Sequence, residues 1–145
     1  SDKNEKKQIL TELSEESRTI ILYEAPHRLL KTLKEIFEYL GDRRVSIVRE
    51  LTKLHEEVLR GNLGNIIADY ESGRVAVRGE YVLVIEGKSL LEKRSERQKS
   101  FEEISIKEHF DKYISEGLDK KEAMKAVAKD RGIQKREVYK ELLGE

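Results

Sequence analysis

Short apolar runs and amphipathic stretches alternate through the first 88 residues of the chain. Thr19–Tyr23, Val45–Val48 and Tyr81–Ile85 are runs of mainly apolar and often β-branched residues, a pattern typical of buried strands. Across Pro26–Leu40, apolar residues recur at intervals of three and four, and Gly41 follows. A proline in the first turn and a glycine after the last turn predict a helix between them.

The order strand, helix, strand favours a parallel pair of strands joined by a crossover helix. Residues 51–59 show no clear period and fit either a loop or a helix. Asn62 is placed to cap a further helix that ends near Gly73, and Val75–Val77 is a candidate for a short edge strand. We therefore predict an α/β domain over residues 18–88.

The other segments of the chain differ in character from this domain. Residues 1–17 are polar, and we expect them to form an interdomain linker or a short helix. We expect residues 89–100 to form a charged linker or an exposed helix. Residues 101–145 contain three short amphipathic stretches, two of which begin with capping-box spacing at Ser105 and Asp119. They predict a small helical module of three helices.

Composition restricts the partners of this chain. Lys and Arg number 29, as do Asp and Glu, so any contact with RNA needs a local basic patch rather than a basic protein. Residues 101–145 carry ten basic and eleven acidic side chains, which argues against strong DNA binding and favours a structural bundle or a weak RNA-docking module. There is no cysteine and no apolar run long enough for a membrane span. We expect a cytoplasmic protein.

Polar clusters lie at the ends of the three predicted strands, where open α/β sheets usually bind ligands. They are Tyr23–Arg28, Arg49–Glu57 and Arg78–Glu80. The first coincides with a helix N-terminus, which attracts anions. Each cluster also has a purely structural interpretation: a surface turn in which Glu24 pairs with Arg28, a solvated charged loop, and a turn that uses a glycine.

Two kinds of site are not expected from the sequence. The three histidines are scattered, without the paired spacing of a zinc motif, so we predict no metal site. The nine glycines never occur as Gly-x-Gly, so the chain has no evident nucleotide-binding loop of its own.

Three blocks of sequence together resemble a known family. TIILYEAPHRLLKTLKEI, VSIVRELTKLHEEVLRGNL and GEYVLVIEG are similar, in order and spacing, to the C-terminal half of bacterial methyltransferases of the tetrapyrrole-methylase superfamily that modify the 2′-hydroxyl of a cytidine in 16S ribosomal RNA. The resemblance spans Arg18–Gly87, and the helical module resembles the tail of the family more loosely. One departure is Ala25, where the family commonly has serine.

The resemblance implies a fold, a methyl donor and a partner. Family members have two α/β domains, and S-adenosylmethionine binds between them, held mainly by an N-terminal domain that is absent here. The domain present would be a mixed sheet flanked by helices. We expect small-subunit ribosomal RNA as the partner, no DNA and no membrane, a homodimer in the full-length protein, and no methyl transfer by this chain alone.

The resemblance also implies that the Glu24–Arg28 turn and the Arg49–Glu57 block face the cleft between the two domains. The candidate catalytic residues, which would accept or transfer protons, are Glu24, His27 and Glu50. The candidates for binding the substrate or its phosphates are Arg28, Arg49 and Lys53. Gly79 is the candidate for contact with the methyl donor.

Two other functions fit the same residues. The chain is alternatively a non-catalytic module that binds RNA or mediates dimerisation. It is alternatively part of a methylase of the same superfamily that acts on tetrapyrroles.

Overall fold

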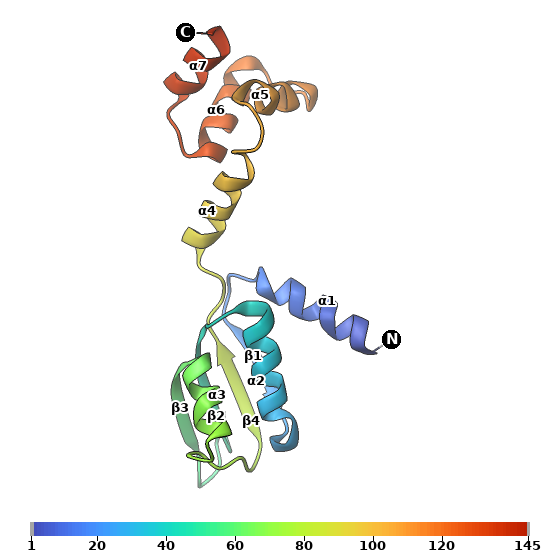
Figure 1. The fold of residues 1–145 in the computed structure, drawn as a ribbon, viewed down its shortest axis with the longest axis vertical. Coiled ribbons are helices and arrows are strands. Elements are labelled where there is room, and N and C mark those ends of the chain that lie inside the picture. The colour runs from blue at the N-terminus through green and yellow to red at the C-terminus, as the bar shows by residue number, and fades with distance from the viewer. Residues whose placement is uncertain (1, 145) are drawn as a thin grey trace. The chain divides into compact units, whose positions relative to one another are not determined.

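The computed structural model describes residues 2–144 and divides into two compact units, Ser1–Ser89 and Leu90–Glu145 (Figure 1). The first unit contains α1 (Asp2–Ser14), β1 (Ile20–Glu24), α2 (Pro26–Leu40), β2 (Arg44–Arg49), β3 (Glu57–Asn62), α3 (Leu63–Glu71) and β4 (Tyr81–Ile85). The second contains α4 (Leu90–Ser100), α5 (Ile106–Ser115), α6 (Lys120–Arg131) and α7 (Lys135–Leu143). No helix within residues 2–144 is both long and apolar enough to cross a membrane.

The four strands of the first unit form one sheet in the order β1-β4-β2-β3, and each neighbouring pair is antiparallel. The α/β class, with helices flanking a sheet, is confirmed. The expected parallel pair is not formed, because β4 returns between β1 and β2 and pairs with both. The first two strands do run in the same direction, but they are not neighbours, so the sheet is antiparallel rather than mixed.

The edge strand beyond β2 differs from the prediction. Residues 57–62 form β3, whereas the sequence suggested a loop or helix up to residue 59 and an edge strand at Val75–Val77. β3 is hard to recognise because it is an edge strand whose residues are mostly exposed and partly charged. Residues 75–77 form no strand; the N–H of Val75 instead donates to the carbonyl of Asp69, at the end of α3.

The start of α3 is held by a residue that the sequence did not indicate. Asn62 occupies the N-cap position, as expected, but its side chain makes no capping hydrogen bond. The carboxylate of Asp42 instead accepts from the N–H of Gly64 at 2.9 Å. This helix therefore has its capping oxygen supplied from another part of the chain.

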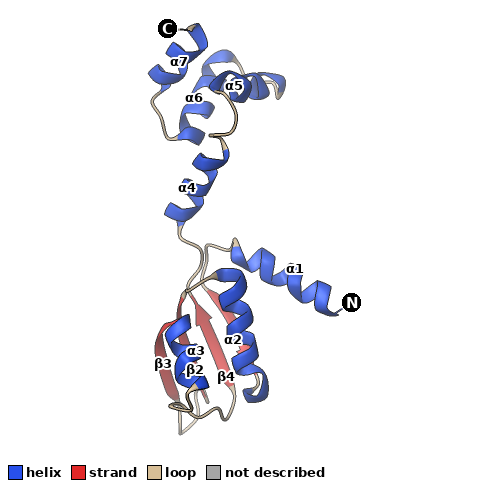
Figure 2. Ribbon diagram, in the orientation of Figure 1, coloured by secondary structure: helices blue, strands red, loops and turns tan. Residues whose placement is uncertain are grey.

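The core lies between one face of the sheet and the helices that cover it (Figure 2). Alternate residues of β2 and β4 are buried on this face, which is the pattern of a sheet covered on one side. The core side chains of the sheet and the two covering helices are Ile20, Val45, Ile47, Tyr81, Leu83 and Ile85 from the strands, Leu29, Leu33, Ile36 and Leu40 from α2, and Leu63, Ile66 and Tyr70 from α3. On β1, the alternate side chains Ile21 and Tyr23 are exposed.

The segments that lead into β1 and out of β4 lie side by side. The N–H of Lys88, just after β4, donates to the carbonyl of Glu16, just before β1, at 2.6 Å. Gly87 makes this approach possible, because a Cβ atom there would lie 2.3 Å from the carbonyl oxygen of Ser17. The segments before β1 and after β4 thus meet at one end of the sheet.

The helical unit has its own small core of Val127, Ala128 and Val138. Both predicted capping boxes are confirmed: Ser105 and Asp119 each accept from the N–H three residues ahead. Residues 89–100, expected as a charged linker or an exposed helix, include helix α4, which is part of this unit.

A buried carboxylate joins three helices of this unit. Asp130 accepts from Arg97 at 2.9 Å and from the hydroxyl of Tyr113, and it contacts Nε2 of His109 at 3.2 Å. His109 is 1% exposed, and its Nδ1 accepts from Arg131, so the ring is neutral and donates from Nε2 to Asp130.

Candidate functional site

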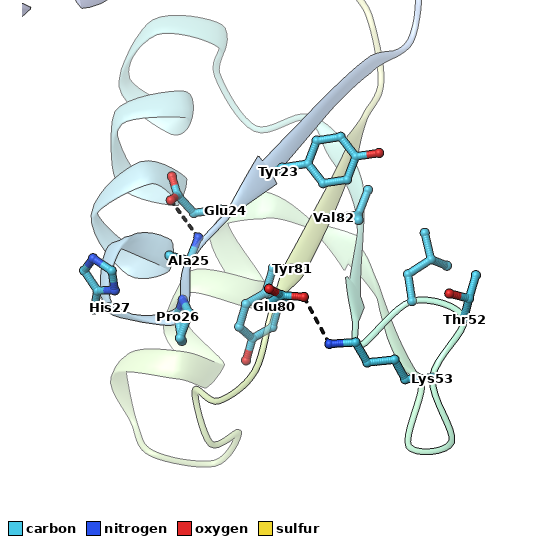
Figure 3. A pocket seen from close by; sticks show the side chains of 11 residues that line it. Tyr23, Glu24, Ala25, Pro26, His27, Thr52, Lys53, Glu80, Tyr81 and Val82 are labelled. Atoms are coloured by element: carbon cyan, nitrogen blue, oxygen red, sulfur yellow. Dashed lines mark hydrogen bonds and ion pairs between the residues drawn. The ribbon is translucent and has the colours of Figure 1, made fainter.

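The three polar clusters meet at one end of the sheet. Tyr81, the first residue of β4, is the register partner of both Glu24 at the end of β1 and Arg49 at the end of β2. A hollow of about 670 Å³ opens there, lined by residues 23–27, 51–53 and 80–82 (Figure 3). Segments up to 59 residues apart in sequence are therefore brought to one place by the pairing of β4 with both neighbours.

The first cluster forms the turn from β1 into α2. The carboxylate of Glu24 accepts from the N–H of Ala25 at 2.8 Å and from the hydroxyl of Thr32 at 2.6 Å. Ala25 is the N-cap of α2 and cannot cap it, so the neighbouring carboxylate occupies the positive end of the helix. Glu24 thus lines the hollow with both oxygens already engaged.

His27 and Arg28 are exposed on the first turn of α2. Within residues 2–144, neither side chain makes a hydrogen bond or an ion pair. Figure 3 shows the ring of His27 directed away from Lys53, although His27 is one of the lining residues. Together with Tyr23, which is also exposed, these two side chains remain available to a ligand in the first cluster.

Arg49 lies on the covered face of the sheet, outside the hollow. Its guanidinium makes two contacts with Glu57, from Nη2 at 2.8 Å and from Nε at 3.2 Å, and a third with the carbonyl of His55 at 3.3 Å. The hydrogen bond from Arg49 lowers the pKa of Glu57. Arg49 therefore fixes β3 against β2 and has few donors left for a phosphate.

The second and third clusters are joined by an ionic network. Lys53 contacts Glu50 at 2.7 Å and Glu80 at 3.0 Å, and Figure 3 shows the bond to Glu80 at the edge of the hollow. Glu50 also accepts from the N–H of Glu80 at 2.7 Å and donates its own N–H to the carbonyl of Glu80 at 2.9 Å. The loop after β2 is in this way tied to the residues that enter β4.

The network shifts the pKa values of Glu50 and Lys53 so that each favours its charged form. The hydrogen bond from Lys53, followed by that from the N–H of Glu80, lowers the pKa of Glu50. The same contact with Glu50, followed by that with Glu80, raises the pKa of Lys53. Glu50 is consequently ionised and a poor proton acceptor near neutral pH, and Lys53 is a fixed cation.

Gly79 is required by this network. It has a φ of +76°, and a Cβ atom at this position would lie 2.0 Å from Oε1 of Glu50. The loop carries further backbone strain, since Glu50 and Thr52 have positive φ values of 52° and 66°. The structure thus gives Gly79 a role in seating Glu50, and Gly79 does not itself line the hollow.

Of the seven candidate residues, Glu24, His27 and Lys53 line the hollow; Arg28, Arg49, Glu50 and Gly79 are in adjoining positions. Sequence reasoning did not select Tyr23, Leu51 or Tyr81, which form apolar parts of its wall. The signal for them was weak: Tyr23 and Leu51 are the apolar members of two of the polar clusters, and Tyr81 follows the third and was assigned to a strand.

Behind the hollow, Tyr70 and Tyr81 form a second polar contact in the covered layer. Burial, together with the neighbouring hydroxyl of Tyr81, raises the pKa of Tyr70 to about 12. Tyr81 also accepts a hydrogen bond from the N–H of Arg78 at 2.9 Å. Tyr70 therefore stays neutral over the physiological range. Among residues 2–144, no group of three or more His, Cys, Asp or Glu side chains is arranged to hold a metal ion.

Comparison with known proteins agrees with the blocks of sequence around this hollow. The model of the tetrapyrrole (corrin/porphyrin) methylase family matches residues 1–67. Ribosomal RNA small subunit methyltransferase I of Bacillus subtilis (strain 168) is 46% identical over 137 residues, which is 94% of this chain and 46% of the relative. The chain belongs to the tetrapyrrole methylase family.

Other members with the same protein name are similar over nearly the whole chain. The relative from Halalkalibacterium halodurans is 41% identical over 94% of this chain and 46% of its own length. The relative from Synechocystis sp. is 37% identical over 92% of this chain and 46% of its own length. The chain thus spans about half the length of the curated relatives that it matches.

Among solved structures, the cobalamin-biosynthetic enzyme cobalt precorrin-4 methyltransferase matches 52% of this chain and 32% of its own, with 23% identity and a TM-score of 0.40.

Proposed function

We propose that this chain is the C-terminal part of an S-adenosylmethionine-dependent methyltransferase that methylates the 2′-hydroxyl of a cytidine in small-subunit ribosomal RNA. The observation that carries the proposal is the extent of the match. The family model ends at residue 67, but similarity to the ribosomal RNA methyltransferases continues over 94% of the chain. The helical unit is therefore shared with relatives that are named for ribosomal RNA, which favours this substrate over a tetrapyrrole.

The methyl donor fits the hollow in size and in the chemistry of its wall. A volume of about 670 Å³ lies within the range of small-molecule sites, roughly 300–1,000 Å³. Tyr23, Leu51 and Val82 offer apolar surface, and Glu80 offers a carboxylate toward a cationic ligand. S-adenosylmethionine supplies an electrophilic methyl group on a positively charged sulfur. Because the chain has no Gly-x-Gly loop, we assign most contacts with the donor to the part of the enzyme that lies outside this match.

Transfer to a ribose hydroxyl requires the hydroxyl to be held in line and its proton to be accepted. His27 is the best-placed acceptor among the candidates, because it is exposed, lines the hollow and has no partner within residues 2–144. Arg28 and Lys53 are cations suited to hold flanking phosphates, with Lys53 positioned by Glu50 and Glu80. Glu24 supports the helix on which His27 stands, and Arg49 supports the sheet edge.

The test uses the full-length enzyme and its matched histidine variants. Purified enzyme is incubated with radiolabelled S-adenosylmethionine and small ribosomal subunits, and the modified nucleoside is identified by digestion and mass spectrometry. We expect 2′-O-methylcytidine from the wild type and a loss of about 100-fold or more in His27→Ala, since general-base catalysis contributes about 10²–10⁴-fold. His55→Ala, an exposed histidine of the same unit that does not line the hollow, should remain within about threefold of the wild type.

Each outcome addresses a separate part of the proposal. Methyl groups found on a base, or on no RNA at all, would overturn the reaction. Normal turnover by His27→Ala would overturn only the assignment of the proton acceptor. The 145-residue chain by itself should transfer no methyl group, and we propose that the full-length enzyme is a homodimer, which sedimentation would check.

A further inference from the structure

The helical unit uses its acidic side chains differently from its basic ones. Glu108, Asp119 and Glu122 belong to the two capping boxes, where their oxygens accept from backbone N–H groups. Asp130 is buried and is held by Arg97, His109 and Tyr113. Four carboxylates are thereby engaged in holding the unit together.

Five basic side chains of α6 and α7 are free by comparison: Lys121, Lys125 and Lys129 on α6 and Arg136 and Lys140 on α7. All five are exposed, and none forms an ion pair with another residue in 2–144. Arg131, in contrast, donates to His109 and to the carbonyl of Ile104. Within each helix the five are spaced by four residues, so they lie along one side of that helix. We call these five residues the α6–α7 cationic surface.

The acidic residues of α7 lie on another side of the helix. Glu137 and Glu141 line a separate hollow together with Arg131. Arg136 and Lys140 each precede one of these glutamates by a single residue, which turns them by about 100° around the helix. The zero net charge of the chain therefore conceals a local separation of charge.

The two helices that carry this surface are packed as a helix–turn–helix pair. α6 ends at Arg131, Gly132 adopts the left-handed conformation with a φ of 65°, and α7 begins at Lys135. Val127 and Val138 are fully buried in the core that the helices share. Tyr139, which is 54% exposed, adds an aromatic ring next to Lys140. The helix backbones that carry these cations are thus fixed before binding, and only the side chains have freedom to lose.

We propose that the α6–α7 cationic surface binds the sugar–phosphate backbone of RNA. The choice of RNA among polyanions rests on the proposed function, whereas the surface itself is defined by its charge. Lysine and arginine side chains neutralise phosphates and release counterions, which dominates affinity for nucleic acids. The major groove of A-form RNA is too deep and narrow for side chains to read its bases. The contacts are therefore to the backbone, and binding depends on structure and salt rather than on sequence.

The experiment compares two triple variants of the 145-residue chain that have the same net charge. One is Lys125→Glu, Arg136→Glu and Lys140→Glu on the cationic surface. The control is Lys3→Glu, Lys7→Glu and Lys31→Glu, at exposed lysines of α1 and α2 that make no ion pair within residues 2–144. Glutamate is a good helix former, so both variants should keep their helix content, which circular dichroism checks.

Binding is measured by fluorescence anisotropy with a short fluorescein-labelled RNA stem-loop, at potassium chloride concentrations from about 50 to 200 mM. We expect the surface variant to bind at least roughly tenfold more weakly, and its slope of log affinity against log salt to be smaller by about 2, since each lost phosphate contact removes roughly 0.7–0.9. The control variant should bind within about threefold of the wild type, because its charges lie outside the contact.

Three results would overturn the proposal. The first is an absence of binding by the wild-type chain at the lowest salt. The second is an equal loss in both triple variants, which would indicate only overall charge. The third is binding of the wild-type chain to a DNA duplex of matching sequence at least tenfold more tightly than to the stem-loop. None of these measurements depends on methyl transfer. An enzyme that showed the expected RNA binding but no 2′-O-methylation would therefore contradict the proposed reaction and still support RNA binding by the α6–α7 cationic surface.

Discussion

The two units of the chain treat their charges in opposite ways. Around the hollow of the α/β unit, two of the three candidate cations are paired with carboxylates: Arg49 with Glu57, and Lys53 with Glu50 and Glu80. In the helical unit, carboxylates are consumed in caps and around Asp130, and cations are left exposed. Equal numbers of acidic and basic residues therefore say little about a surface, because local packing decides which charges remain free.

The largest expected effect concerns the buried carboxylate of the helical unit. Asp130→Ala should lower the free energy of unfolding of this unit by about 3 kcal/mol, because it leaves buried polar partners, above all His109, without their acceptor. Amide hydrogen exchange of α5 and α6 measures this unit separately. Asp111→Ala, at an exposed residue of α5, is the control and should change it by no more than about 0.5 kcal/mol. Similar losses in both variants would show that burial of the charge does not matter.

A smaller loss of stability is expected at Gly79, which leaves room for the side chain of Glu50 in the ionic network. Gly79→Ala and Gly73→Ala both place a side chain at a positive φ, 76° and 71°, which costs about 1–2 kcal/mol. Only the alanine at 79 also collides with Glu50, since nothing lies within 4 Å of a Cβ at Gly73. Urea unfolding should therefore show a larger loss for Gly79→Ala. In a Glu50→Ala background the two glycine substitutions should become equal; a persistent difference would place the collision elsewhere.

Replacing the N-cap residue should lower the free energy of unfolding by up to about 1 kcal/mol more in α5 of the helical unit than in α3 of the α/β unit. Ser105→Ala removes a capping box in the helical unit and should cost about that much. Asn62→Ala, at the N-cap of α3, should cost only a few tenths, because its side chain makes no capping bond and Asp42 supplies the acceptor. Unfolding monitored by circular dichroism compares the two, and equal losses would contradict the capping geometry.

The smallest expected effect is a pH dependence confined to the helical unit. Burial, the largest cause, lowers the pKa of His109, while Asp130 opposes the shift. In the unfolded chain the ring takes up a proton near pH 6.5, but in the folded chain it does so only at lower pH. As the pH falls from about 6.5 through the lowered pKa, the unfolded state binds more protons and stability falls. His109→Gln should reduce this dependence in hydrogen exchange of α5 and α6; an unchanged profile would assign it to other groups.

Much of the fold was predictable because local patterns and long-range packing agree. The helix Pro26–Leu40, the strands at the centre of the sheet and both capping boxes follow from periodicity and short spacing. The strand order did not follow, because insertion of β4 between β1 and β2 is a long-range choice with no local signature. β3 escaped notice for a similar reason, since an edge strand needs few apolar residues.

The sequence indicated where the candidate site lies but not which of its side chains pair with one another. The first two polar clusters were expected to face one cleft, and in the structure all three clusters lie beside Tyr81. Sequence offered no means to tell which side chains would pair with one another. Arg49 and His27 looked equally available, yet Arg49 is held on the covered face and His27 is exposed. The partners of Arg49, Glu57 and the carbonyl of His55, depend on the pairing of β3, which was itself missed.

The contact between Lys88 and Glu16 has a mechanical consequence. Since the segments that lead into β1 and out of β4 meet at one end of these adjacent antiparallel strands, tension applied there would load their hydrogen bonds one after another, as in a zipper. A sheet loaded lengthwise would instead have to break its bonds together.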